Sequence, residues 1–135
     1  MNLAELETLL QVQLRTISDD LVYLQTPLTL AFDGNHLGVY VEHLGSERYR
    51  LSDNAELLFT ALAAGMKATG KRGEQLKLAV NQHQLQLSQQ GELFCTCTQD
   101  ELPYWVARFL DASAGISQLC RDWIPDVYPV KLTTG

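Results

Sequence analysis

Apolar and polar residues alternate on both sides of Asp33-Gly34-Asn35, and this pattern constrains the fold more than any other feature of the chain. An alternation with a period of two is typical of a β-strand that buries one face, and an Asp-Gly pair favours a tight hairpin turn. A second turn at Gly45-Ser46-Glu47 leads into another, shorter apolar run. We therefore expect an antiparallel meander of three strands, at residues 28–32, 37–44 and 48–51.

Four other segments repeat their apolar residues every three to four positions, as amphipathic helices do. Two of them open with a capping-box pattern, Asn2 with Glu5 and Asp53 with Glu56. We expect the first helix to end near Ser18, because the two aspartates that follow are unfavourable at the negative end of a helix dipole. The four helices are expected from residue 2 to 18, from 53 to 65, around 76–80 and from 100 to 123.

A second hairpin is expected around the polar turn Gln89-Gln90-Gly91, because apolar residues alternate from Leu85 to Leu87 and from Leu93 to Cys97. The predicted order is helix, three strands, two helices, two strands, helix (α-β-β-β-α-α-β-β-α). This order favours an α+β fold in which helices pack on a mostly antiparallel sheet.

The length of 135 residues suits one domain with a core of its own. We place this domain at residues 1–123, and Pro125 and Pro129 indicate a C-terminal tail at residues 124–135. No apolar run approaches the roughly 18 residues of a membrane span, and the N-terminus has two glutamates where a signal peptide has positive charge. We therefore expect a cytoplasmic protein that does not contact a membrane.

Sixteen acidic and ten basic residues give the chain a net charge of -6. This balance opposes attraction to phosphate backbones, so nucleic acid is disfavoured as a partner. Another protein is the expected partner, and a homodimer stays open.

The three cysteines, Cys95, Cys97 and Cys120, are odd in number, which favours reduced thiols. Cys95 and Cys97 with His83 could begin a zinc site, but a structural zinc site needs four ligands at characteristic spacings, which this sequence lacks. Free cysteine is among the residues most often buried, so we expect all three to pack in the core. No phosphate-binding or dinucleotide-binding motif is present, and we expect neither a metal nor a cofactor.

Asp33, His36, Asp53 and Glu56 form the one group that could act as an acid/base cluster, since Asp33 and Asp53 each end a predicted strand. Local structure explains the same residues without chemistry. Asp33 suits a turn, Asp53 suits a helix N-cap and Glu56 completes that cap. We therefore expect no catalytic residues.

Two groups of residues have no structural role that their positions predict. Lys67, Lys71 and Arg72 concentrate positive charge in a short loop, and Tyr104 and Trp105 are consecutive on the last helix, so they cannot both face inward. Exposed aromatic residues often dominate protein binding. These five residues are the candidates for partner contact.

From Pro27 to Ile116 the chain resembles an uncharacterised bacterial and phage family of unknown function, family 1828. The resemblance rests on Phe32-Asp33-Gly34-Asn35-His36, Val39-Tyr40-Val41-Glu42, Arg50-Leu51-Ser52-Asp53-Asn54-Ala55-Glu56-Leu57-Leu58-Phe59 and Gly91-Glu92-Leu93-Phe94. The family more often has an acidic residue and a glycine where this chain has Asn54 and Ala55, which argues against a functional site at the cap. The resemblance implies no activity or cofactor, but its occurrence in prophages implies an accessory role in conflict between phage and host.

Together these observations predict a non-catalytic protein-binding module, such as a phage- or prophage-encoded inhibitor of a bacterial defence system of the anti-CRISPR or anti-restriction kind. Two alternatives stay open. One is a small enzyme of an unrecognised class that uses Asp33, His36 and Asp53. The other is a self-associating regulatory or antitoxin-like subunit, in which the long final helix would supply the apolar surface.

Overall fold

The computed structural model describes residues 13–32 and 35–125. Its strands are β1 (Gln13–Ser18), β2 (Leu21–Thr29), β3 (His36–Gly45), β4 (Arg48–Ser52), β5 (Gln86–Leu87) and β6 (Leu93–Thr98). Its helices are α2 (Glu56–Ala63), α3 (Lys71–Gln82) and α4 (Leu102–Asp122), and α4 is preceded by the single 3-10 turn η1 (Gln99–Glu101).

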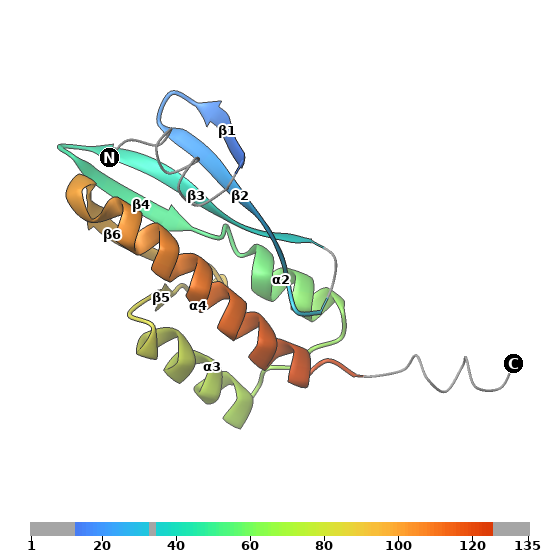
Figure 1. Cartoon of the computed structure of the whole chain (residues 1–135). Coiled ribbons are helices and arrows are strands. Elements are labelled where there is room, and N and C mark those ends of the chain that lie inside the picture. Colours follow the sequence, from blue (N-terminus) through green and yellow to red (C-terminus); the bar gives the residue numbers. More distant parts are fainter. Residues whose placement is uncertain (1–12, 33–34, 126–135) are drawn as a thin grey trace, which may run out of the picture.

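The strands form one antiparallel sheet in the order β1-β2-β3-β4-β6-β5. Figure 1 shows α4 lying across one face of this sheet, and α2 and α3 both pack against α4. None of the helices within residues 13–32 and 35–125 is both long and apolar enough to cross a membrane.

The core lies between α4 and the sheet face that α4 covers. Every second residue of the central strands points into it, so Val39 and Val41 of β3 and Leu51 of β4 are almost fully buried. Val106 and Phe109 of α4 are fully buried against them. The alternation in the strands and the helical spacing in α4 therefore bury their apolar residues at one shared interface.

The predicted order, in which one helix is followed by three strands, was wrong, because the described residues begin with four consecutive strands. The expected first helix, residues 2–18, was wrong over its last part. Residues Gln13–Ser18 form the strand β1, which pairs with β2, while residues 1–12 lie outside the described residues. The spacing of Leu14 and Ile17 suits a helix turn, but Leu14 instead lies opposite Leu24 in the antiparallel ladder. The two aspartates after Ser18 form the tight turn that reverses the chain into β2.

The strand expected at residues 28–32 was displaced, and the meander has four strands, β1 to β4, instead of three. Strand β2 ends at Thr29, and the chain beyond it turns towards β3, where the Leu30 amide donates to the Asn35 carbonyl at 2.9 Å. Leu30 is nevertheless buried and Phe32 packs against the core. Leu30 and Phe32 therefore contact the core from the loop between β2 and β3. A period of two in the sequence does not distinguish such a loop from a strand.

Candidate functional site

A row of three aromatic residues and one serine crosses the sheet face opposite α4. Tyr23 of β2 lies opposite Tyr40 of β3, Tyr40 lies opposite Ser52 of β4, and Ser52 lies opposite Phe94 of β6. The rings of Tyr23 and Tyr40 are in contact, with centroids 4.7 Å apart. Cross-strand aromatic pairs of this kind stabilise a sheet and hold each other in place.

Two arginines on the same face stack on this row. The guanidinium of Arg15 lies 5.4 Å from the centre of the Tyr23 ring, and that of Arg50 lies 4.6 Å from the centre of the Phe94 ring. Arg50 also donates two hydrogen bonds of 2.8 Å to the two carboxylate oxygens of Glu92, and Ser52 donates a third to the same carboxylate. The bond from Arg50 lowers the pKa of Glu92 and raises the pKa of Arg50, because each charge stabilises the other.

Tyr40 stands between two hollows of the same face. One has a volume of about 200 Å³ and is lined by Leu21 and Glu92 among others, and the other has a volume of about 360 Å³ and is lined by Arg15 and Thr60 among others. Tyr40 lines both of them. We call this region, formed by Arg15, Tyr23, Tyr40, Arg50, Ser52, Glu92 and Phe94, the Tyr40 surface.

Glu56, at the start of α2, holds the Tyr40 ring in position. The Tyr40 hydroxyl donates to the Glu56 carboxylate at 3.0 Å. Burial, followed by this hydrogen bond, raises the pKa of Tyr40 to about 12, so the hydroxyl keeps its proton and stays a donor. The capping-box prediction was therefore wrong for Glu56, whose side chain bonds across to β3 and not back to the helix start.

Gly38 makes room for Tyr23 on this face. A Cβ atom at position 38 would lie 2.1 Å from the Tyr23 hydroxyl oxygen and 2.3 Å from the ring carbon that bears it. The Tyr23 ring can therefore lie across β3 only because residue 38 has no side chain.

Asp53 joins the end of β4 to the start of α2 and to β6. Its Oδ1 accepts hydrogen bonds from the amides of Ala55 (2.8 Å) and Leu93 (2.9 Å), and its Oδ2 accepts one from the amide of Leu57 (3.2 Å). Helix α2 begins at Glu56 with Ala55 at the N-cap position, so the prediction of Asp53 as the N-cap residue was wrong by two positions, although its side chain still accepts a hydrogen bond from an amide of the first turn. Burial raises the pKa of Asp53 to about 6, although the three amides act in the opposite direction.

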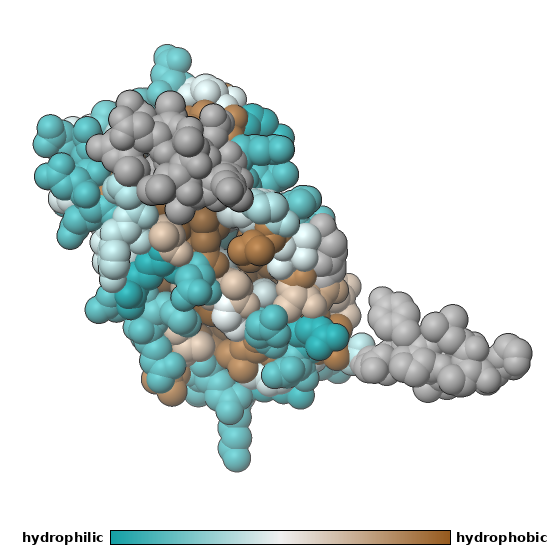
Figure 2. Space-filling view, viewed as in Figure 1, coloured by the Kyte–Doolittle hydropathy of each residue, from teal (hydrophilic) through white to brown (hydrophobic). Residues whose placement is uncertain are grey.

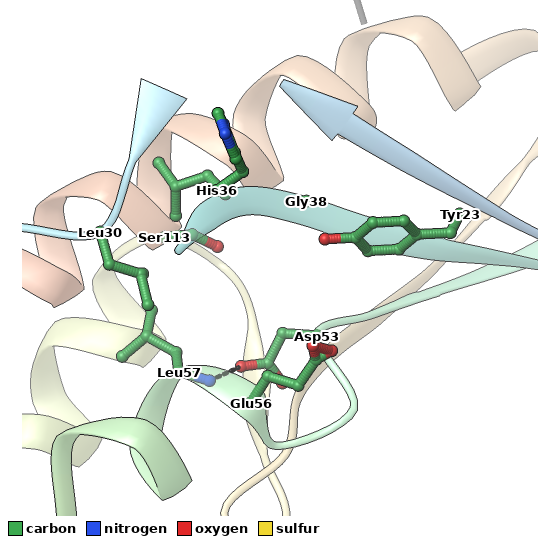
Figure 3. A pocket seen from close by; sticks show the side chains of 9 residues that line it. Tyr23, Leu30, His36, Gly38, Asp53, Glu56, Leu57 and Ser113 are labelled. Carbon is green, nitrogen blue, oxygen red and sulfur yellow. Dashed lines mark hydrogen bonds between the residues drawn. The ribbon is translucent and has the colours of Figure 1, made fainter. Parts of the chain in front are cut away.

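A small cavity of about 30 Å³ lies between β2, β3, α2 and α4 (Figure 3). Tyr23, His36, Asp53, Glu56 and Ser113 all line it, and the Ser113 hydroxyl is buried without a hydrogen-bond partner among the described residues. This volume suits a single water molecule. The cavity is therefore too small for a substrate.

The structure brings three members of the expected acid/base cluster, His36, Asp53 and Glu56, to this one cavity, whereas Asp33 lies outside the described residues. Each of the three is engaged in a hydrogen bond. His36 Nδ1 lies 3.0 Å from the Thr26 carbonyl, Asp53 holds three amides and Glu56 holds Tyr40. Their hydrogen bonds connect backbone segments, and among the described residues the cavity that all three line has a volume of only about 30 Å³.

The turn before α2 has a strained backbone at a residue other than glycine. Asn54 and Ala55 have φ angles of 56° and 62°, in the left-handed region, which costs alanine about 1–2 kcal/mol. A glycine at position 55 would adopt this conformation without strain.

Ala55→Gly is therefore expected to raise the free energy of unfolding by about 0.5–1 kcal/mol, because relief of the strain exceeds the added entropy of the unfolded chain. Urea unfolding monitored by circular dichroism would measure the change. Ala107→Gly, at an exposed position inside α4, is the control and should lower the same quantity by about 1 kcal/mol. A loss of stability in Ala55→Gly would contradict the expected strain.

The aromatic pair on the last helix lies at the N-terminal end of α4. Tyr104 is 58% exposed, whereas Trp105 packs against the core, and their rings meet edge to face with centroids 5.5 Å apart. Arg108 donates to the Tyr104 hydroxyl at 2.9 Å, and its guanidinium lies within 6 Å of both ring centres. Tyr104 is thus held in place at the surface, and its role in partner contact stays a prediction.

The basic residues lie near the opposite end of α4. Lys71 and Arg72 belong to the first turn of α3 and not to a loop, while Lys67 precedes it. Arg72 donates to the Lys67 carbonyl at 3.1 Å and stacks 5.6 Å from the centre of the Trp123 ring. Tyr104 and Trp123 are about 28 Å apart along α4, so the two predicted contact groups do not form one surface.

All three cysteines are reduced and buried, which confirms their expected place in the core. Burial raises the pKa of Cys95 and Cys120 to about 12 and that of Cys97 to about 11. Within residues 13–32 and 35–125, no group of three histidine, cysteine or acidic side chains gathers where it could hold a metal ion.

Most of the Tyr40 surface was not predicted from the sequence. Tyr40 and Arg50 fall in predicted strands, but Arg15 was expected in a helix and Tyr23 was assigned to no strand. The alternation from Leu21 to Thr26 carries a signal for β2, since its inward residues Val22 and Leu24 are apolar.

A family model described as "Domain of unknown function DUF1828" matches residues 26–116 of the chain. The matched segment includes Tyr40, Arg50, Asp53 and Glu92, and it begins after Tyr23. No curated protein and no solved structure matches the chain.

Proposed function

The chain belongs to the DUF1828 family, a domain of unknown function, and we propose that it is a non-catalytic protein-binding module whose partner docks on the Tyr40 surface. One observation carries the proposal. Tyr23, Tyr40 and Phe94 form a row with two stacked arginines on the sheet face opposite α4, with a hollow on either side of Tyr40.

The residue types of this surface suit a protein interface. Tyrosine and arginine are enriched among the residues that dominate binding energy. Here the rings of Tyr23 and Tyr40 contact each other, and Arg50 is held by two bonds to Glu92. Because these side chains are already ordered, little conformational entropy is lost when a partner binds. The hollows of about 200 and 360 Å³ are large enough to accept single side chains of a partner.

The charges of this surface favour a protein over a nucleic acid. Arg15 and Arg50 lie beside Glu42, Glu56 and Glu92, so both signs are interspersed over the two hollows. A surface that binds phosphate backbones needs an excess of positive charge, and the whole chain has a net charge of -6.

For the identity of the partner, we propose a component of a bacterial defence complex in the cytoplasm, which a phage-encoded module would inhibit by occupying its surface. The accessory role in conflict between phage and host that the sequence resemblance implies supports this choice. A protein that inhibits by occupying a surface needs no catalytic group. The Asp53 carboxylate, which binds three backbone amides, has a structural role that is compatible with this kind of inhibition.

The proposal is tested by comparing capture of a partner from bacterial lysate by the wild type, Tyr40→Ala and Tyr104→Ala. Tyr104 is the matched control, because it is an exposed tyrosine on a different element. We expect the wild type and Tyr104→Ala to retain a stoichiometric partner, and Tyr40→Ala to weaken its affinity by about tenfold or more.

Two results would contradict the proposal. If Tyr40→Ala still binds the partner and Tyr104→Ala does not, the interface lies on α4 and not on the Tyr40 surface. Repeated recovery of no stoichiometric partner at low salt would remove the basis for a binding module. Mass measurement over a range of concentrations would show whether the partner is a second copy of the chain.

A further inference from the structure

Helix α2 is apolar on nearly all sides, but the described residues cover only one of its faces. Leu57, Leu58 and Ala61 are buried in the core, whereas Phe59 is 73% exposed and Leu62 is 53% exposed. A helix that is hydrophobic all round is normally buried all round. We call the exposed pair, Phe59 and Leu62, the α2 ridge.

The last described residues bring the chain back to α2. The Pro125 ring lies against Gly65, just after α2 ends, where a Cβ atom would be 3.2 Å from Pro125 Cδ. Figure 1 shows that α4 ends at the same end of the molecule as α2. Residues 126–135 therefore continue from a point beside the C-terminal end of α2.

The composition of residues 126–135 matches the α2 ridge. The segment reads DVYPVKLTTG and has four apolar residues within six positions, Val127, Tyr128, Val130 and Leu132. Six residues of extended chain span about 20 Å, while the eight residues of α2 are about 12 Å long, so this stretch reaches past the helix.

The charges set a direction for this stretch. Asp126 follows Pro125, which lines a hollow together with Lys67 and Arg72 near the C-terminal end of α2. Lys131 comes five residues after Asp126. Five residues of extended chain that begin near the C-terminal end of α2 are long enough to reach Glu56 at its N-terminal end. Opposite charges would therefore meet at both ends if the segment ran antiparallel to α2.

We propose that residues 126–135 bind along the α2 ridge, antiparallel to α2, and cover Phe59 and Leu62. Because the segment is tethered at Pro125, its effective concentration at the ridge is high, so a small apolar contact suffices. The inference does not depend on the Tyr40 surface, which is formed by the sheet.

Hydrogen exchange of the full chain tests this inference. We expect the backbone amides between Val127 and Leu132 to exchange at least about tenfold more slowly than an unstructured peptide of the same sequence. Phe59→Asp should remove this protection, because a carboxylate on the ridge opposes an apolar contact. Leu78→Asp, at a leucine of α3 that is 59% exposed, is the matched control and should leave the protection unchanged.

Three outcomes would overturn the proposal. In the first, these amides exchange in the wild type as fast as in the free peptide. In the second, the amides between Val127 and Leu132 are equally protected in Phe59→Asp and Leu78→Asp, and circular dichroism shows that both variants are folded. In the third, the protection grows with protein concentration and a dimer mass appears, which would assign the α2 ridge to a second copy.

Discussion

Asp53→Ala is expected to lower the free energy of unfolding by about 3 kcal/mol. The substitution removes the acceptor of three backbone amides, those of Ala55, Leu57 and Leu93, and a buried donor without a partner costs about 1–3 kcal/mol. Asp53 is only 6% exposed, so water cannot replace the lost bonds without opening the turn. The substitution also removes the bond between Asp53 and Leu93 of β6, which lie 40 residues apart in the sequence.

Urea unfolding at pH 7 would measure this loss, with Asp111→Ala as the control. Asp111 is an exposed aspartate of α4, and its replacement should change stability by less than about 0.5 kcal/mol. Asp53→Asn should fall between the two, because the amide oxygen still accepts from Ala55 and Leu93 while its NH₂ group faces the amide of Leu57. An equal effect of Asp53→Ala and Asp111→Ala would show that the three bonds contribute little.

The stability of the wild type is expected to fall by about 1 kcal/mol between pH 5 and pH 7 because of Asp53. Burial raises the pKa of its carboxyl from 3.8 to about 6, so the folded state binds this proton more tightly than the unfolded state does. The resulting stabilisation is fully present below pH 3.8 and is lost as the pH rises through 6. Glu92, whose pKa is lowered by Arg50, acts in the opposite direction, and its contribution is lost as the pH falls below 4.5.

The measurement compares unfolding free energies of the wild type and Asp53→Asn at several pH values from 5 to 8. This window lies above the range in which Glu92 titrates, and the difference between the two proteins cancels the groups they share. We expect the difference to change by about 1 kcal/mol from pH 5 to pH 7 and then to level off. A difference that does not vary with pH would mean that Asp53 is ionised throughout this range.

Local patterns were sufficient to predict that the Asp53 side chain binds backbone amides at the start of α2, but they placed the N-cap two residues before its position at Ala55. The bond of Asp53 to the Leu93 amide could not be predicted, since it depends on the pairing of β4 with β6. The same holds for Glu56, whose partner Tyr40 is set by the place of β3 beside the start of α2.

The N-terminal error has a similar cause. Between Gln13 and Ser18 the sequence is compatible with a helix and with a strand, and a short segment does not distinguish the two periods. Pairing with β2 decides in favour of the strand, because it places Leu14 opposite Leu24 and satisfies the backbone groups of both.

By itself, the sequence determined that this protein is an α+β fold with an antiparallel sheet, because periods of two and of three to four residues are local properties that show which side chains must be buried. Only the tertiary structure decided where Tyr23, Tyr40, Arg50 and Phe94 come together. They lie on four strands, of which β6 is separated from the other three by about 40 residues, and their contacts depend on the order and register of those strands. Strand register is set by the burial of the opposite face, so the candidate binding surface is a consequence of how the core packs.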